Sequence, residues 1–208
     1  MMSEDRAPAA TNISWQPDPI GRVRRERVSG HRGAVVWFTG LSGAGKTTIA
    51  RGVEAALGAR RVHAYVIDSE NVRHGLSADL GFSPEERREH LRRLGEVARM
   101  FADAGVIALV SVISPYRAMR RRIRELVGPD FLEVHVATPL AVCESRDPRG
   151  LYARARIGLI PDFTGVSAPY EEPEDAELVL HPENEPVEAS VRRVVSFLDN
   201  FAVLEVPR

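Results

Sequence analysis

The 208-residue sequence has one cysteine, no excess of either charge and no long apolar run. A single cysteine, Cys143, cannot form an internal disulfide, which favours a reducing compartment. The net charge of −1 gives no sign of a nucleic-acid or membrane partner. No apolar run approaches the roughly 18 residues that span a bilayer, and the first residues lack the apolar stretch of a signal peptide. We therefore expect a cytoplasmic protein.

What is present is an alternation of short apolar runs with helical patterns. Continuous apolar runs are typical of parallel strands that are buried on both faces. Strands and helices that alternate over this length predict a single α/β domain with a parallel sheet between two layers of helices. The expected strands lie at 34–40, 62–67, 106–113, 131–137 and 177–180, and the expected helices at 47–57, 84–104, 116–126, 140–145 and 186–201.

Two segments fall outside this alternation. Residues 1–33 are polar and contain prolines, which predicts a loosely attached arm that Ile13 and Trp15 could dock onto the domain at 34–208. Residues 147–173 are interrupted by glycines and prolines, and a connection of this length inside a compact domain is usually a functional lid. The apolar groups available to dock this lid are Tyr152, Phe163 and Tyr170.

The only lysine of the chain lies in a glycine-rich motif, GLSGAGKT at 40–47. The motif matches G-x-x-x-x-G-K-[ST] and stands between a predicted strand and a predicted helix. Small residues let backbone N–H groups turn inward around phosphate oxygens, and the helix N-terminus adds its positive end. The Lys46 ammonium fits between phosphates where the wider guanidinium of arginine would fit poorly. The motif therefore predicts ATP as cosubstrate and a three-layer P-loop NTPase fold, and it disfavours the alternative of a glycine-rich turn without a ligand.

The residues predicted to bind the nucleotide belong to this loop and to the first turn of the following helix. Thr47 is expected to ligate Mg²⁺ through its hydroxyl. For Thr48, helix packing is the stronger interpretation. The full set is Gly40, Ser42, Gly43, Ala44, Gly45, Lys46, Thr47 and Thr48.

A carboxylate, Asp68, ends the second predicted strand and should lie beside the phosphate loop at the carboxyl edge of the sheet. It can accept the proton of an acceptor hydroxyl or hold a magnesium-bound water, and the sequence does not separate these roles. We take Asp68 as a catalytic residue together with Lys46, and as a magnesium ligand together with Thr47. The alternative is a helix N-cap, for which Asp is a favoured residue. Glu70 is interpreted as solvated.

Several arginines follow within one turn and helix, and arginine binds phosphate and sulfate in bidentate fashion. A subset of them is therefore expected to hold an anionic acceptor. By contrast, the arginines at 120–122 are interpreted as a solvated helix face. Phe82 and Phe163 are flanked by loop residues, where stacking on a planar base and core packing both remain open. The arginines considered for the acceptor are Arg73, Arg87, Arg92 and Arg93.

Longer stretches of the sequence carry a more specific pattern: TNISW at 11–15, VVWFTGLSGAGKTTIA at 35–50, NVRHGLSADLGFSPEERRE at 71–89, FADAGVIALVSVISPYR at 101–117 and RDPRGLYARAR at 146–156. Together with FTGV and PYEEP in the lid, they resemble the adenylyl-sulfate kinase family. Its members use ATP to phosphorylate the 3′-hydroxyl of adenosine 5′-phosphosulfate (APS). The resemblance runs nearly end to end, and it implies an ATP- and Mg²⁺-dependent kinase of sulfate activation, a homodimer, and a functional link to ATP sulfurylase.

The resemblance also implies roles for individual residues. Arg73, Arg87 and Phe82 would hold APS, and Phe163 would close on its purine. Ser114 would lie at the edge of the acceptor site, where the family's serine has been proposed as a phosphorylation site, so Ser114 is a further catalytic candidate. The remaining implied contacts are Ile113, Pro115, Tyr116 and His90 to the acceptor, and Arg146 and Asp147 to the adenine of ATP.

The chain departs from the family pattern around the expected acceptor. Residues 68–71 read DSEN where the family usually has D-G-D-N, and His90 replaces a usual asparagine. In the lid, Ala153 replaces a usual lysine, and residues 161–162 read PD instead of Lys-Gly. These changes keep open the alternative of a related kinase that phosphorylates another small hydroxyl compound. A further alternative is a nucleotide-binding regulatory partner with little turnover, against which the intact Lys46, Thr47 and Asp68 argue.

Overall fold

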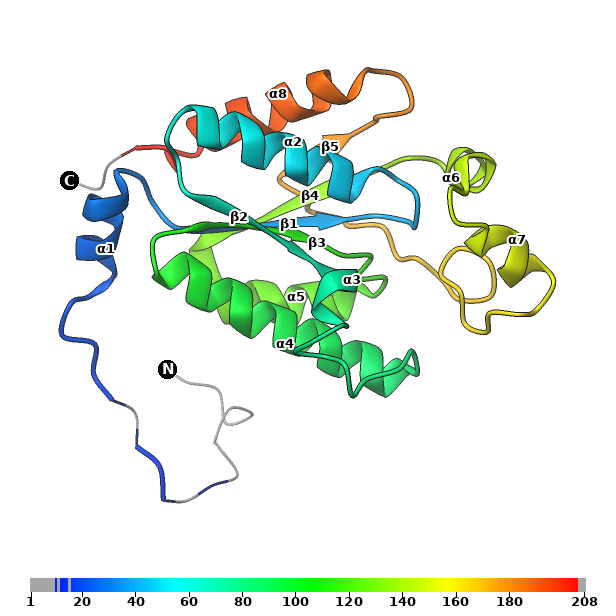
Figure 1. Ribbon diagram of the computed structural model, residues 1–208, viewed down its shortest axis with the longest axis horizontal. Coiled ribbons are helices and arrows are strands. Elements are labelled where there is room, and N and C mark those ends of the chain that lie inside the picture. The colour runs from blue at the N-terminus through cyan, green and yellow to red at the C-terminus, as the bar shows by residue number, and fades with distance from the viewer. Residues whose placement is uncertain (1–9, 11, 15, 206–208) are drawn as a thin grey trace.

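A computed structural model describes residues 10, 12–14 and 16–205 of the chain. Its centre is a five-stranded parallel sheet in the order β2-β3-β1-β4-β5 (Figure 1). The strands are β1 (Ala34–Thr39), β2 (Ala64–Asp68), β3 (Ile107–Ser111), β4 (Phe131–Val136) and β5 (Leu178–Leu180). Because all strands run in one direction, their carboxyl ends share one edge of the sheet, which is where open α/β folds bind ligands.

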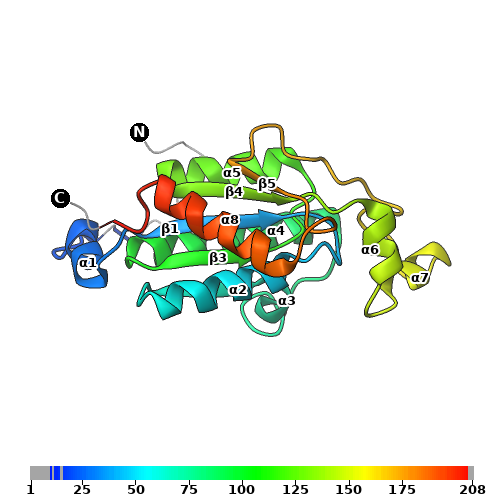
Figure 2. The ribbon, with the colours of Figure 1, turned by 90° about the horizontal axis from the view of Figure 1, so that it is seen from above.

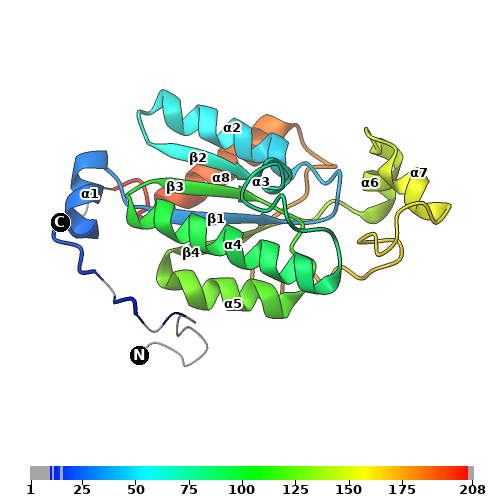
Figure 3. The same ribbon diagram turned by 60° about the horizontal axis from the view of Figure 1, so that its bottom comes forward.

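Helices cover both faces of the sheet. On one face lie α2 (Lys46–Ala59) and α8 (Val187–Asn200), and on the other lie α4 (Pro84–Asp103) and α5 (Arg117–Val127), as Figures 1 and 2 show. Short helices follow the carboxyl ends of the strands: α3 (Ser69–Val72) directly follows β2, while α6 (Leu140–Arg146) and α7 (Leu151–Arg156) lie beyond the edge of the sheet, as Figure 3 shows. The predicted three-layer α/β fold is confirmed.

The central strand β1 shows why both faces must be covered. All six of its residues are buried, and successive side chains of a strand point to opposite faces. Val36 and Phe38 pack in the core beneath α2 and α8. Val35 and Trp37 pack in the second core, beneath α4 and α5. A strand buried on both sides leaves no polar positions, which is the reason for its continuous apolar sequence.

The longest helix, α4, begins with a capping box. The Ser83 hydroxyl accepts from the backbone N–H of Glu86, while the Glu86 carboxylate accepts from the backbone N–H of Ser83. The same carboxylate also accepts from the backbone N–H of Gly81, at 2.9 Å. These bonds satisfy N–H groups that a helix start leaves unpaired. They also fix the loop that carries Phe82 next to the carboxyl edge.

The N-terminal residues contain a helix at the opposite end of the sheet, α1 (Arg22–Ser29). Glu26 in this helix is buried and accepts from the backbone N–H of Gly33, and Arg22 pairs with both Glu26 and Asp130. Of the two residues suggested to dock the arm, Ile13 is largely exposed and Trp15 lies outside the described residues.

The remaining element is a single 3₁₀ turn, η2 (Gly128–Asp130), between α5 and β4. In the described part of the chain, no helix has both the length and the apolar character that crossing a membrane needs.

Candidate active site

The phosphate loop between β1 and α2 depends on glycines. Gly40 has φ of 150° and Gly45 has φ of 106°, both in the region that side chains disfavour. A Cβ atom on Gly40 would also lie only 2.5 Å from the carbonyl oxygen of Val136. Any other residue at position 40 would push the loop away from β4. The first turn of α2 begins here with its N–H groups free of intrahelical partners, as a phosphate group requires.

The side chain of Lys46 folds back and bonds to the phosphate loop. Its side chain is buried, and Nζ donates to the carbonyl oxygen of Leu41 at 2.6 Å. Burial lowers the pKa of Lys46 to about 8, so the ammonium is still mostly charged at pH 7. A buried cation with a single neutral acceptor is poorly compensated, and a polyphosphate would supply the missing negative charge. The residues of the loop therefore fit a bound nucleotide.

Thr47 and Asp68 lie side by side next to the loop. The Thr47 hydroxyl donates to Oδ2 of Asp68 at 2.9 Å, which leaves it to accept from the Ser111 hydroxyl at 2.8 Å. The described residues contain no cluster of three or more His, Cys, Asp or Glu that could hold a metal alone. A Mg²⁺ ion on Thr47 and Asp68 would therefore take its other ligands from phosphate oxygens and water, which is its usual preference.

Asp68 also has the capping role that the sequence left as an alternative. Its Oδ1 accepts from the backbone N–H groups of Glu70 and Asn71, at 2.9 and 3.2 Å, and so caps α3. The two interpretations are compatible because they use different oxygens. Capping fixes the carboxylate so that Oδ2 stays turned toward Thr47. Ser111, the last residue of β3, was missed by the sequence analysis, although a polar residue at a strand end was the signal available.

A pair of arginines flanks Phe82, and one of them, Arg73, ends the short helix α3 that Asp68 caps. The guanidinium carbon of Arg73 lies 4.4 Å from the Phe82 ring centroid, and that of Arg87 lies 5.8 Å from it. The ring is 63 % exposed, so it is not a core residue. Burial and the nearby Arg87 lower the pKa of Arg73. Two cations around an exposed aromatic ring make a surface suited to a planar, anionic ligand.

The lid reaches this surface through Arg87. Arg87 donates to the carbonyl oxygen of Asp162 at 2.6 Å and to the hydroxyl of Thr164 at 3.2 Å, on either side of Phe163. At its other end, the Tyr152 hydroxyl donates to the carbonyl oxygen of Ser42 in the phosphate loop, at 2.9 Å. The rings of Tyr152 and Phe163 meet edge to face, with centroids 5.1 Å apart. The lid thus contacts both the predicted nucleotide site and the predicted acceptor site.

Ser114 follows β3 and is buried in an unusual backbone conformation, with φ of 43°. Its hydroxyl accepts from the indole N–H of Trp37 at 3.1 Å and donates to the Thr39 hydroxyl at 2.9 Å. Thr39 in turn donates to the carbonyl oxygen of Ile113, at 2.7 Å. The hydroxyl of Ser114 is therefore fully engaged, and its catalytic role stays a prediction. Pro115 is also buried, next to it.

His90 lies beneath the surface rather than on it. It is 2 % exposed, and its Nε2 is 2.8 Å from the hydroxyl of Ser69. Burial, with the positive charges of Arg73 and Arg93, lowers the pKa of His90 to about 4, so the ring is neutral at pH 7. The two departures from the family pattern, Ser69 and His90, are thus in contact with each other, directly behind Asp68.

Several other predicted residues have different surroundings from those expected. Thr48 is exposed, so its interpretation as a packing residue is wrong. Arg92 pairs with Glu89 and Arg93 pairs with Asp79 and Glu89, so neither is free to hold an acceptor.

The residues predicted to contact the adenine lie at the head of the lid. Arg146 is exposed at the end of α6, and Asp147 accepts from the backbone N–H of Ala153. Glu70, expected to be solvated, is exposed but pairs with Arg149 of the lid. Arg120, interpreted as a surface residue, is 3 % exposed.

The fold and this site define a class of protein: a phosphotransferase built on a P-loop nucleotide-binding fold.

The sequence comparisons identify the family more specifically than the fold does. The family model of adenylylsulphate kinases matches residues 32–181. An adenylyl-sulfate kinase of Shewanella amazonensis is 54 % identical over 188 residues, covering 90 % of this chain and 95 % of that protein. One from Acaryochloris marina is 47 % identical over 197 residues, covering 94 % of this chain and 96 % of that protein. The chain belongs to the adenylyl-sulfate kinase family.

A solved structure agrees with this assignment. The APS kinase of Mycobacterium tuberculosis in complex with AMPPNP and APS superposes with a TM-score of 0.78 at 47 % identity, covering 81 % of this chain and 99 % of that chain. The family resemblance expected from the sequence is confirmed. The roles of individual site residues stay predictions.

Proposed function

We infer that this protein transfers the γ-phosphoryl group of ATP to the 3′-hydroxyl of APS and so forms 3′-phosphoadenosine 5′-phosphosulfate. The observation that carries this proposal is that one lid contacts both the phosphate loop and Arg87 beside Phe82, while Asp68, next to Thr47, caps the short helix that ends at Arg73. A kinase for a nucleotide acceptor needs two nucleotide sites that meet at the transferred group. Family membership names the acceptor.

At the ATP side, the loop amides and Lys46 would hold the β- and γ-phosphates. Thr47 and Asp68 would hold the Mg²⁺ ion, which when bound neutralises charge on these phosphates. Burial lowers the pKa of Lys46, and a bound polyphosphate would favour the charged form of its side chain. The exposed Arg146 and its neighbour Asp147 stand at the head of the lid, where we propose that they contact the adenine.

At the acceptor side, Arg73 and Arg87 would pair with the phosphosulfate, and Phe82 with Phe163 would enclose the purine. Asp68 then faces the 3′-hydroxyl. Its Oδ2 already accepts from the Thr47 hydroxyl and keeps a second lone pair, which would take the proton of the 3′-hydroxyl or hold a magnesium-bound water, while Oδ1 accepts from the α3 cap. We propose that the buried Ser114 acts by holding the loop that borders this site, with Ile113 and Pro115.

Three further features belong to this proposal. We propose a cytoplasmic location, which the single cysteine and the use of ATP support. A homodimer and a functional association with ATP sulfurylase are proposed from the family resemblance.

The test is a coupled assay of ADP release with APS, compared with other nucleotides and with sugars as acceptors. We expect rapid ADP release only with APS. Lys46→Ala should lose most activity, and Asp68→Asn should lose about 100-fold in kcat with little change in ATP affinity. Asp175→Asn is the matched control, because Asp175 is exposed and far along the chain from the loop. Acceptor-independent ADP release would contradict the proposed reaction, and near-normal turnover of Asp68→Asn would remove Asp68 from it.

A further inference from the structure

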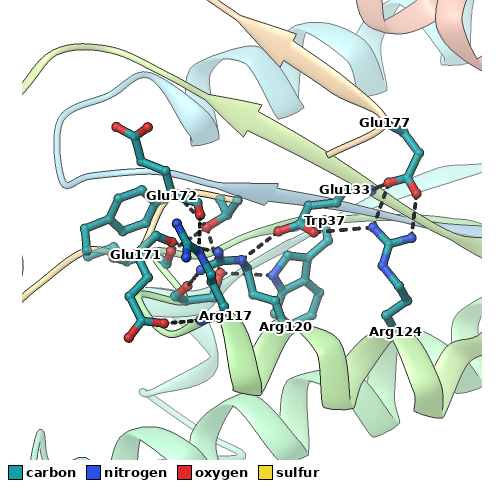
Figure 4. Close-up of polar contacts among 12 residues, drawn as sticks. Trp37, Arg117, Arg120, Arg124, Glu133, Glu171, Glu172 and Glu177 are labelled. Atoms are coloured by element: carbon teal, nitrogen blue, oxygen red, sulfur yellow. Dashed lines mark hydrogen bonds and ion pairs between the residues drawn. The ribbon is translucent and has the colours of Figure 1, made fainter. Parts of the chain in front are cut away.

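Three arginines on one face of α5 form a row that we call the arginine ladder: Arg117, Arg120 and Arg124. Their spacing of three and four residues places them on the same side of the helix. Figure 4 shows all three turned toward the chain that returns from the lid, residues 171–177. Arg117 donates to the Glu172 carbonyl and pairs with Glu174. Arg124 binds both carboxylate oxygens of Glu177. The ladder therefore fixes the end of the lid to α5.

The middle member is the buried one. The guanidinium group of Arg120 contacts three separate parts of the chain. Nη1 donates to the carbonyl oxygen of Ser114 at 2.6 Å, and Nη2 donates to the carbonyl oxygen of Glu171 at 2.7 Å. Its Nε lies 2.7 Å from Oε1 of Glu133 in β4, an ion pair with both side chains less than a tenth exposed. A buried cation needs its charge matched and its donors bonded. Here the Glu133 carboxylate supplies the opposite charge, and the two carbonyl oxygens accept from the terminal nitrogens.

The two carbonyl groups belong to two separate segments of the chain, 113–115 and 170–171, which Arg120 joins. Ser114 sits in the loop after β3, which borders the proposed acceptor site, and its positive φ makes that loop costly to hold. Glu171 lies at the end of the lid, and its backbone N–H donates to the carbonyl oxygen of Pro115 at 2.8 Å. Next to it, the Tyr170 hydroxyl lies 3.0 Å from the Thr39 hydroxyl and must donate to it, because Thr39 uses its own proton on Ile113.

We propose that Arg120 is a positioning residue of the acceptor site: its guanidinium fork sets the loop at 113–115 and the lid end at 170–171 at a fixed spacing. The link to the acceptor rests on the proposed function, whereas the link between the two segments does not. The fork is needed because three partners lie in three directions around it. A lysine ammonium at the same place can reach Glu133 or one carbonyl, but its single nitrogen cannot span both carbonyls.

The first experiment measures this link without any substrate. Amide hydrogen exchange, read by mass spectrometry, is compared in the wild type, Arg120→Lys, Arg124→Lys and Arg121→Lys. The Glu171 amide, bonded to Pro115, should exchange about tenfold faster in Arg120→Lys. Arg124→Lys should instead speed the Glu133 amide, which is bonded to Glu177. Arg121 is exposed on the same helix, so Arg121→Lys should change neither. Unchanged exchange at Glu171 in Arg120→Lys would overturn the proposal, whatever the acceptor is.

The second experiment is kinetic and uses the APS-dependent ADP assay. Arg120→Lys should raise the KM for APS about tenfold while the KM for ATP stays within about twofold. The reason is that only the segments beside the proposed acceptor site, 113–115 and 170–171, lose their fixed spacing. A merely structural defect would change both constants or the amount of folded enzyme. Equal rises in both KM values would therefore overturn the role in the acceptor site. A wild type inactive on APS would overturn the proposed function instead, leaving the exchange result to decide the link.

A double variant covers the case in which Arg120→Lys fails to fold. Arg120→Met with Glu133→Gln removes both buried charges together, so no unpaired ion is left in the interior. It should fold and show the same faster exchange at Glu171 and the same selective rise in the KM for APS. Wild-type values of both in the double variant would contradict the role of the fork.

Discussion

At the scale of single residues, the site depends on polar groups whose burial changes their properties. Lys46 is the only ammonium of a side chain in the sequence, and it stands where a compact, buried cation is needed. Asp68 divides its two oxygens between a helix cap and the neighbouring Thr47. In both cases one residue stabilises the local fold and at the same time presents a charge to the site.

His90 makes the stability of the protein depend on pH. Its pKa is about 4 in the folded state, against about 6.5 for an unperturbed histidine. Between these values the unfolded chain binds more protons than the folded one, so stability falls as the pH falls from about 6.5 toward 4. The groups that face the ring are the Ser69 hydroxyl and the cations Arg73 and Arg93, none of which favours a charged imidazole.

We therefore expect His90→Asn to weaken this acid sensitivity. The measurement is the urea midpoint of unfolding at pH 7 and pH 5, which should differ less in the variant than in the wild type. His74→Asn is the matched control, because His74 is exposed on the loop after α3. A pH 5 to pH 7 difference as large in His90→Asn as in the wild type would show that the buried ring does not cause it.

At the scale of elements, the lid is held at its near end by the buried Tyr152 of α7 and at its far end by the arginine ladder. Its tip carries Ile157 and Leu159, which are 72 % and 64 % exposed. The pair between Arg149 and Glu70 is exposed on both sides, and such pairs contribute little. The contact that joins α7 to the phosphate loop is the hydrogen bond from Tyr152 to Ser42. The buried Tyr152 thus joins α7 to the phosphate loop, and the arginine ladder holds the chain beyond residue 170.

Loss of that hydrogen bond should loosen the lid. Tyr152→Phe keeps the buried ring and removes the hydroxyl, so we expect cleavage by trypsin after Arg154 and Arg156 to become several-fold faster. Tyr65→Phe is the control, since Tyr65 is half exposed in β2. An ATP analogue together with APS should slow cleavage in the wild type. Identical cleavage of Tyr152→Phe and the wild type, with and without ligands, would refute this account of the lid.

At the scale of the whole molecule, α1 closes the end of the sheet opposite the active site. His31 is buried, and its Nε2 accepts from the backbone N–H of His63 ahead of β2. The backbone N–H of Arg32 donates to the carbonyl oxygen of Val203 near the C-terminus. Arg22 of α1 pairs with Asp130, so the segment at 22–32 contacts three distant parts of the chain.

Two truncations should separate the parts of the N-terminal segment. A protein that begins at residue 22 should melt within a few degrees of the full chain, because these contacts remain. One that begins at residue 34 should melt roughly 5–10 °C lower, because it exposes the surface that α1 covers and leaves Asp130 without its arginine partners. Differential scanning calorimetry gives both values. Equal melting temperatures of the two truncated proteins would mean that α1 adds nothing to stability.

Much of the fold and part of the site could be predicted from the sequence because they depend on local order along the chain. The apolar runs at β1 and β3 fix strands buried on both faces, and the glycines of 40–45 fix a loop that only one ligand chemistry explains. Asp68 was found because it ends a strand. Each of these signals lies within a few neighbouring residues.

Only the tertiary structure decided which residues meet across the chain. It turned Arg120 from a presumed surface residue into the buried link between Ser114 and Glu171, it paired Ser69 with His90, and it brought Ser111 to Thr47. The physical reason is that a side chain's burial and partners depend on which elements pack against it. A helical pattern of arginines has the same sequence signature in water and against a sheet, so the local sequence determined the elements while their packing determined the polar network.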